Sequence, residues 1–96
     1  MKQITFRKKK LTLGFDRYYN ERLCITLIDA NTGEEYLRAT VNIPDVELGK
    51  DELIIKDYSE NEGILKALVD AGVIEETGKY VQTGFVKFPV CLIKHK

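Results

Sequence analysis

Apolar and polar residues alternate along most of the chain, and this pattern predicts β-strands. The apolar positions of residues 4–6 and of residues 11–15 lie on opposite parities, on either side of the charged quartet at residues 7–10. A change of parity reverses which face of a strand is buried, so it indicates a tight hairpin or a bulge there. We therefore predict two short strands joined at residues 7–10.

Two further strands are predicted at residues 23–28 and 36–43, joined by a turn at Asn31-Thr32-Gly33. The second strand alternates most regularly, with its odd-numbered residues apolar. Such alternation is typical of a sheet with one packed face and one wetter face. The even-numbered residues are predicted to face outward: Tyr36, Arg38, Thr40 and Asn42. Pro44 ends this strand because proline cannot donate to a strand ladder.

One segment alone, residues 57–72, predicts a helix. Ser59 and Glu62 have the spacing of a capping box, in which each side chain accepts from the other residue's backbone amide. Gly72 is predicted to end the helix, since glycine takes the left-handed conformation that closes a helix. The helix would pack through one apolar stripe, formed by Ile64, Leu65 and Leu68.

Strand patterns also flank the helix. Residues 53–55 form a short apolar run before it, and a hairpin is predicted after it, beginning at residues 79–81. Pro89 falls inside the last strand and favours an edge position or a bulge there. The predicted inward residues of that strand are Val86, Phe88, Val90 and Leu92.

These elements predict a single α+β domain over residues 1–96. Its expected architecture is an antiparallel sheet of about five to seven strands, with one helix packed on one face. A chain of this length buries roughly 60–65% of its unfolded surface, which is enough for one core. We expect little room for a deep substrate cavity beside that core.

The net charge is zero, from 15 basic and 15 acidic residues, but the charges are unevenly distributed. Residues 1–22 hold seven bases and two acids (+5), and residues 79–96 hold four bases and no acid (+4). Residues 23–78 hold four bases and thirteen acids (−9). If the two ends pair in space, the molecule would have a basic side and an acidic side.

Few residues are candidates for catalysis. The single histidine, His95, lies next to the C-terminus, and the single serine, Ser59, is explained as a helix cap. The glycines are scattered, with no phosphate-binding loop. Cys24 and Cys91 lie within apolar runs and lack the spacing of a metal site, so we expect buried, unreactive thiols. We predict no enzyme, no cofactor and no bound metal.

Binding offers more candidates. Arg7, Lys8, Lys9 and Lys10, together with Arg17, Tyr18, Tyr19 and Arg22, mix cations with aromatic rings. Such a mixture is typical of surfaces that bind single-stranded nucleic acid. The alternative is a solvated hairpin tip whose lysines protect an edge strand from aggregation, and the sequence pI of 6.6 favours it.

Acidic residues in the middle of the chain permit an opposite hypothesis, in which they imitate the phosphates of DNA. These residues are Asp45, Glu47, Asp51, Glu52, Asp57, Glu60 and Glu62. A solvated acidic face explains them equally well.

A third candidate surface is the predicted outward face of residues 36–43. Tyr36, Arg38, Thr40 and Asn42 would form a contact surface if they are exposed together with Lys87 of the last strand. Phe85 and Ile93 fall on the less clearly buried parity of that strand, which makes them candidates for pairing two copies.

Several segments resemble a family of small uncharacterised bacterial proteins encoded on conjugative elements, plasmids and phage-derived islands. The resemblance rests on the run from Ile55 to Gly63, on Thr77-Gly78, on Thr83-Gly84-Phe85-Val86 and on the run from Thr40 to Pro44. It spans roughly residues 2–93 and consists of turn and cap residues, so it implies no catalytic residue. It implies an accessory protein of a mobile element that acts in the cytoplasm of its bacterial host.

We therefore expect a non-enzymatic binding or regulatory protein that acts by protein–protein contact. The start of the chain lacks an apolar stretch of signal-peptide type, and the longest apolar run, residues 88–93, is far shorter than a membrane span. A cytoplasmic location without membrane contact is expected. Two alternatives remain open: a nucleic-acid-binding accessory protein that uses the basic N-terminal hairpin, and a DNA-mimicking inhibitor of a host defence enzyme.

Overall fold

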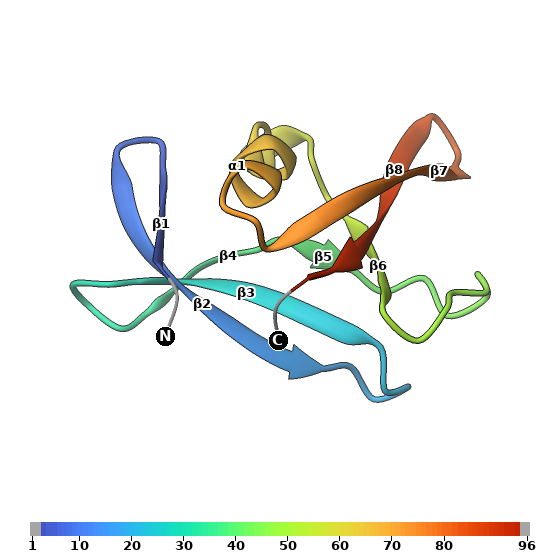
Figure 1. The fold of residues 1–96 in the computed structure, drawn as a ribbon, viewed down its shortest axis with the longest axis horizontal. Coiled ribbons are helices and arrows are strands. Elements are labelled where there is room, and N and C mark those ends of the chain that lie inside the picture. Colours follow the sequence, from blue (N-terminus) through green and yellow to red (C-terminus); the bar gives the residue numbers. More distant parts are fainter. Residues whose placement is uncertain (1–2, 95–96) are drawn as a thin grey trace.

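The computed structural model describes residues 3–94, which form two four-stranded antiparallel sheets and one α-helix (Figure 1). The first sheet has the order β1-β2-β3-β4, with strands β1 (Gln3–Phe6), β2 (Lys9–Arg17), β3 (Leu23–Asp29) and β4 (Glu35–Arg38). The second has the order β5-β6-β8-β7, with strands β5 (Thr40–Val41), β6 (Glu52–Ile55), β7 (Ile74–Thr83) and β8 (Val86–Ile93). A 3₁₀ turn, η1 (Ser59–Asn61), precedes helix α1 (Ile64–Asp70).

The α+β class, the antiparallel strands and the single helix are confirmed, but the prediction of one sheet is wrong. The chain passes from the first sheet to the second at Ala39, between β4 and β5. The Ala39 N–H donates to the Ile25 carbonyl in β3 (2.9 Å), and the Ala39 carbonyl accepts from the Lys56 N–H (2.8 Å). One continuous alternating segment thus contributes strands to two sheets. Alternation identifies the residues of a strand but not the strands beside it, so the sequence pattern did not predict this division.

Thr40, predicted to face outward, is buried instead, with 2% of its surface exposed. Its hydroxyl accepts from the Ile25 N–H (3.3 Å) and shares a hydrogen bond with the Tyr18 hydroxyl (2.9 Å). At the crossing point both faces of the chain are covered, so the even-numbered residues of this segment do not form one exposed face.

The core lies between the two sheets, and α1 packs against β1 and β7, the strands at the outer edges of the two sheets. Figure 1 shows the helix between the β1–β2 and β7–β8 hairpins. Ile64 and Leu68 are fully buried in this position, and Leu65 is partly buried against the core. The helix therefore bridges two sheet edges instead of lying on one face of a single sheet.

The predicted capping box at Ser59 and Glu62 is wrong. Gly63 adopts a left-handed conformation (φ 96°), so the α-helix begins only at Ile64. The Asp57 carboxylate caps it instead, accepting from the N–H groups of Gly63 (3.1 Å) and Leu65 (2.9 Å). Ser59 lies in η1 with φ 58°, where its side chain makes no cap hydrogen bond. The glycine delays the helix by one turn, which places the earlier acid within reach of the unpaired amides.

The predicted helix end at Gly72 is confirmed. Gly72 has φ 74°, its N–H donates to the Val69 carbonyl, and the Val73 N–H donates to the Leu68 carbonyl, both at 3.0 Å. These two bonds form a Schellman motif, which satisfies carbonyl groups that the helix leaves unpaired.

The prediction of which residues of β8 face the core is also wrong. Cys91 and Ile93 belong to the main core, whereas Leu92 is 37% exposed. Phe88 and Val90 are buried, but on the opposite face and outside the main core cluster. Because both faces of this strand are covered over much of its length, apolar alternation does not identify the one that meets the core.

The capping geometry gives a direct test. We expect Asp57→Ala to lower the free energy of unfolding by about 0.5–2 kcal/mol, because it leaves two helical amides without an acceptor. Glu62→Ala should change it by less than about 0.5 kcal/mol, since Glu62 is exposed and its side chain caps nothing. Urea denaturation of both variants measures the difference. Equal losses in the two variants would support the capping box instead.

Candidate contact site

The outer part of the β7–β8 hairpin, residues 80–89, is a two-stranded extension of the second sheet that we call the arm (Figure 1). Strand β8 pairs with β6 only from Leu92 to Val90, and beyond Val90 it pairs with β7 alone. Pro89 is the first residue past the end of the β6 ladder, and proline has no N–H with which to continue that ladder.

Pro89 was predicted to mark an edge position or a bulge, and the structure has both. Strand β8 lies between β6 and β7 from Val90 to Leu92, but at Pro89 it pairs with β7 alone, so the proline occupies an open edge. The ladder between β7 and β8 shifts register between Glu76 and Tyr80, and Tyr80 is the partner of Pro89. The irregularity is therefore on β7, directly beside the proline.

The tip of the arm carries the most exposed large apolar side chain in the described chain. Thr83 pairs with Val86, which leaves Gly84 and Phe85 as a two-residue turn. Gly84 has φ 59°, as the first central residue of a type II′ turn requires. Phe85 has a relative exposure of 105%, so its ring makes no packing contact with the fold. The glycine between two strand patterns is the sequence signal that locates Phe85 at this tip.

The two faces of the arm differ. On one face Tyr80 is 58% exposed, and the Lys87 ammonium lies 5.9 Å from the centre of its ring. On the other face Phe88 is buried, with its ring centre 5.7 Å from that of Tyr58. The arm is thus anchored through Phe88, while its tip and its Tyr80 face remain exposed to solvent.

An ion pair holds the base of the arm against β6. The Lys79 ammonium lies 2.5 Å from a Glu52 carboxylate oxygen, and the other oxygen accepts from the Gly49 N–H (2.7 Å). The Lys79 hydrogen bond, followed by that of Gly49, lowers the pKa of the Glu52 carboxyl below its ordinary value. Because Lys79 is engaged, Lys87 is the cation that the arm presents to a partner.

In the basic hairpin that is the candidate for nucleic-acid binding, some of the cations are bonded within the fold and others are not. Arg7 and Lys8 form the β1–β2 turn with φ 52° and 64°, and the Arg7 guanidinium donates to the carbonyls of Glu60 (2.8 Å) and Glu62 (2.9 Å). Lys9 forms an ion pair with Asp29 at 3.0 Å.

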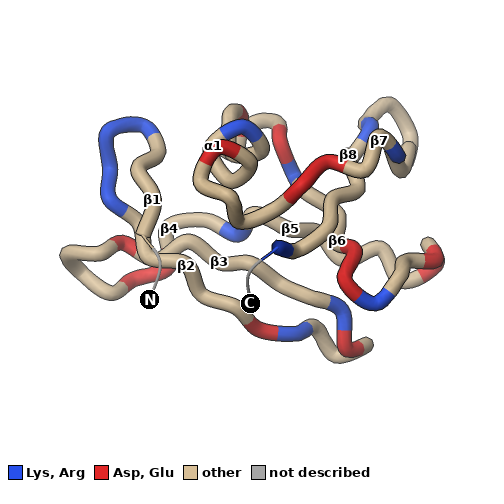
Figure 2. Tube along the Cα trace, in the orientation of Figure 1, with Lys and Arg blue, Asp and Glu red and all other residues tan. Residues whose placement is uncertain are grey.

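The side chains of the remaining two cations of this quartet, Lys8 and Lys10, make no hydrogen bond or ion pair with any residue of the described part of the chain. Figure 2 shows the quartet as basic residues around the tip of the β1–β2 hairpin. The N-terminal strands and β8 belong to different sheets, so the two basic ends of the chain do not pair.

The aromatic part of that candidate set lies at the other end of β2. Along a strand, the eight residue-to-residue steps from Lys10 to Tyr18 span roughly 26 Å. The Tyr18 hydroxyl is bonded to Thr40, and burial, the largest cause, raises the pKa of that hydroxyl. Tyr19 is 83% exposed, but it is separated from the basic quartet. Arg22 donates to the carbonyls of Ile43 and Val46 and so holds a loop of its own chain.

The third candidate surface is not assembled as predicted. The Lys9 ammonium lies 5.4 Å from the centre of the Tyr36 ring, and Arg38 approaches Glu35 at 3.8 Å. Asn42 accepts from the Asn20 side chain at 3.2 Å. Lys87 belongs to the arm of the second sheet, so it does not share a face with Tyr36 and Arg38, which lie on β4 of the first sheet.

Much of the acidic middle of the chain is used within the fold. Asp57 caps α1, Glu60 forms an ion pair with Lys56 at 2.6 Å, and Glu52 binds Lys79. Asp45 and Glu47 are exposed in the loop before β6. The seven acids therefore do not form one free acidic surface.

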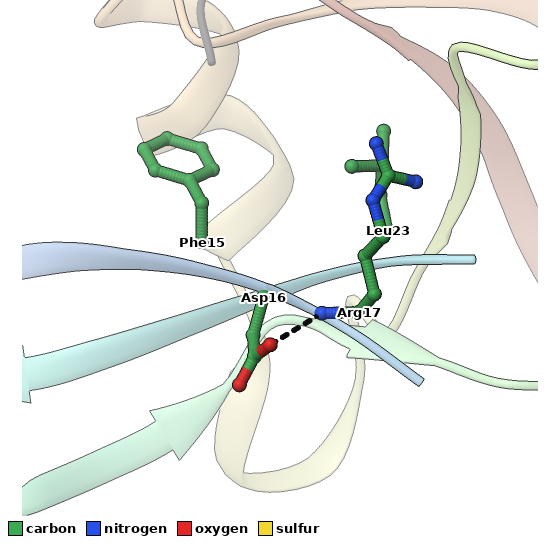
Figure 3. A pocket seen from close by; sticks show the side chains of 4 residues that line it. All are labelled: Phe15, Asp16, Arg17 and Leu23. Carbon is green, nitrogen blue, oxygen red and sulfur yellow. Dashed lines mark hydrogen bonds between the residues drawn. The ribbon is translucent and has the colours of Figure 1, made fainter. Parts of the chain in front are cut away.

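A depression of about 400 Å³ is lined by Phe15, Asp16, Arg17 and Leu23 (Figure 3). Phe15, Arg17 and Leu23 point to one side of the strands, and Asp16 points to the other. The Arg17 guanidinium donates to the Glu21 carbonyl (2.7 Å), and the Arg17 N–H donates to the Asp16 carboxylate (2.8 Å). This depression brings together no nucleophile and base. His95 lies outside the described residues.

Both cysteines are buried, as expected, and burial raises the pKa of the Cys91 thiol to about 12. Within residues 3–94, no three His, Cys, Asp or Glu side chains cluster in a way that could hold a metal ion. No helix in this part of the chain has the length and apolar character needed to cross a membrane.

No family model, curated protein or solved structure matches this chain. The resemblance to proteins of mobile elements therefore stays a prediction. The arm remains the candidate site on structural grounds alone, since it combines an exposed aromatic tip with an anchored base.

The ion pair at the base of the arm predicts a pH effect. The folded-state pKa of Glu52 is lower than its ordinary value of 4.5, so its stabilising contribution is present above that value and is lost as pH falls through the folded pKa. We expect the stability difference between wild type and Glu52→Gln to shrink between about pH 5 and pH 3. Urea denaturation across this range measures it. A difference that does not change with pH would contradict this assignment.

Proposed function

We propose that this protein is a non-enzymatic binding module that acts by contact with another protein, and that the arm makes the contact. The observation that carries the proposal is the full exposure of Phe85 at the tip of an anchored hairpin. An aromatic side chain that contributes no packing to its own fold is well suited to packing against a partner. Aromatic residues are enriched at protein interfaces, where they often provide much of the binding energy.

The neighbours of Phe85 support this assignment. Tyr80 presents a second exposed ring on the arm, and Lys87 lies beside it. Burying a phenylalanine side chain in a partner contributes about 1.5–3 kcal/mol. The arm would need little rearrangement on binding because Phe88 and the Lys79–Glu52 pair already hold its base.

A protein partner is favoured over nucleic acid by the number of available cations. Single-stranded nucleic acid is usually bound by a basic groove that follows the phosphates between stacking rings. The arm offers Lys87 alone, and Arg7 and Lys9 of the basic hairpin are bonded within the fold. The mobile-element context and the cytoplasmic location that we propose for this module are supported by the sequence resemblance.

Partner capture from a bacterial lysate, read by mass spectrometry, tests the proposal. We expect Phe85→Ser to reduce recovery of the partner by about tenfold or more. Tyr19→Ser is the matched control, because it removes an aromatic residue of 83% exposure outside the arm, and it should leave recovery unchanged. Neither variant should change the thermal midpoint by more than a few degrees.

Two results would contradict the proposal. One is a specific partner whose recovery is the same with wild type and Phe85→Ser. The other is the recovery of nucleic acid in place of protein, lost steeply as salt is added, which would favour the basic hairpin.

A further inference from the structure

Strand β7 lies at the outer edge of the second sheet, so one side of its backbone has no strand partner among residues 3–94. Its first residues pack near α1, and its last four, Tyr80–Thr83, belong to the arm. An unpaired strand edge is a template on which another strand can add.

The hairpin register identifies which backbone groups point outward. In a two-residue hairpin, the residues that flank the turn exchange hydrogen bonds, so Thr83 and Val86 bond to each other, and Val81 and Phe88 do the same two residues further on. Tyr80 and Gln82 occupy the alternate pairs, and their N–H and C=O groups therefore face away from β8. The position of Pro89 opposite Tyr80 agrees with this, because that pair needs no proline N–H.

The usual protections of an edge strand are confined to residues 75–79 of β7. Glu75, Glu76 and Lys79 are charged, and the register shift between Glu76 and Tyr80 interrupts the strand. Tyr80–Thr83 contains no charge, no proline and no bulge, and the uncharged run continues through Phe85. The outward groups of Tyr80 and Gln82 are thus left open to pairing.

We infer that a second copy of this chain pairs antiparallel with β7 along Tyr80–Gln82. This inference rests on the proposed function and names the partner of the arm. In the register that we infer, Tyr80 pairs with Gln82 of the second copy, and Val81 pairs with its own counterpart on the two-fold axis. The outward groups of both chains are then satisfied by the same pairing.

Charge favours a second copy as the occupant. An isologous contact places the same residues on both sides, so it is stable only where like charges do not meet. Here the paired residues are uncharged, with valine against valine at the axis and tyrosine against glutamine on each side. A register shifted toward Glu75 and Glu76 would bring carboxylates together and would cross the irregular part of β7.

The same register gives Phe85 a neighbour. It places the tip of each arm beside residues 77–79 of the second copy. Gly78 there has φ 84°, and no atom lies within 4 Å of the position that a Cβ would occupy. The exposed ring of Phe85 would therefore meet open space beside a glycine rather than a crowded side chain.

Cysteine cross-linking tests the register. Residues that face each other in a pair without mutual hydrogen bonds have Cα atoms about 4.5 Å apart, within the range of a disulfide. We expect Val81→Cys to form covalent dimers under mild oxidation. Thr83→Cys is the control on the same strand and face, and it should stay monomeric because its counterpart would lie roughly 13 Å away. The native cysteines are buried, so wild type provides the background.

Sedimentation velocity tests the pairing without cysteine. Wild type should shift from monomer toward dimer as its concentration rises into the high micromolar range, and Gln82→Pro should stay monomeric. Proline at this position removes an outward N–H and spares the hydrogen bonds between β7 and β8.

The inference is overturned if wild type stays monomeric at every concentration, or if both cysteine variants cross-link equally. Larger species in place of dimers would also overturn it, since they indicate unspecific edge aggregation. Monomeric behaviour together with Phe85-dependent capture of another protein would leave the proposed function intact. A dimer together with Phe85-independent capture would refute that function and retain the pairing.

Discussion

The crossing of the chain at Ala39 is the constraint on which the architecture depends. Its backbone is hydrogen-bonded to β3 on one side and to the residue after β6 on the other, and its side chain is fully buried. A larger side chain at this point would have to displace the packing of both sheets. Because the two sheets meet here, the core is closed on one side by the chain itself. On the opposite side the edges β1 and β7 remain apart, and α1 fills the space between them.

Most strands and the existence of one helix could be predicted from the sequence, since alternation and turn residues are local signals. The strands that pair with one another could not be predicted in this way. Residues 35–41 alternate as one strand yet contribute to two sheets. Strand β8 is buried on both faces from Phe88 to Cys91, so its periodicity does not identify the side that meets the core. The capping box failed for a related reason: Gly63 shifted the start of the helix, and Asp57 became the cap. The sequence identifies which residues carry charge. It does not identify the intramolecular partners that bind Arg7, Lys9 and Glu52.

The arm combines features that the fold does not need for its own stability. Pro89 releases the end of β8 from β6, Gly84 makes a tight turn, and Phe85 is carried into solvent. Each of these residues has a local signature in the sequence. Their combined effect depends on the pairing of β8 with β6, which requires the three-dimensional register. A contact site of this kind is therefore visible from sequence only as scattered turn residues.

The β1–β2 turn shows how distant parts of the chain depend on one another. Two residues with side chains, Arg7 and Lys8, adopt left-handed conformations that favour glycine, and this costs free energy. Arg7 offsets the cost by bonding to carbonyls 53 and 55 residues away, in the segment that precedes α1. The first hairpin is thus complete only when the middle of the chain is in place. The first hairpin and the segment before α1 should consequently gain and lose their structure together.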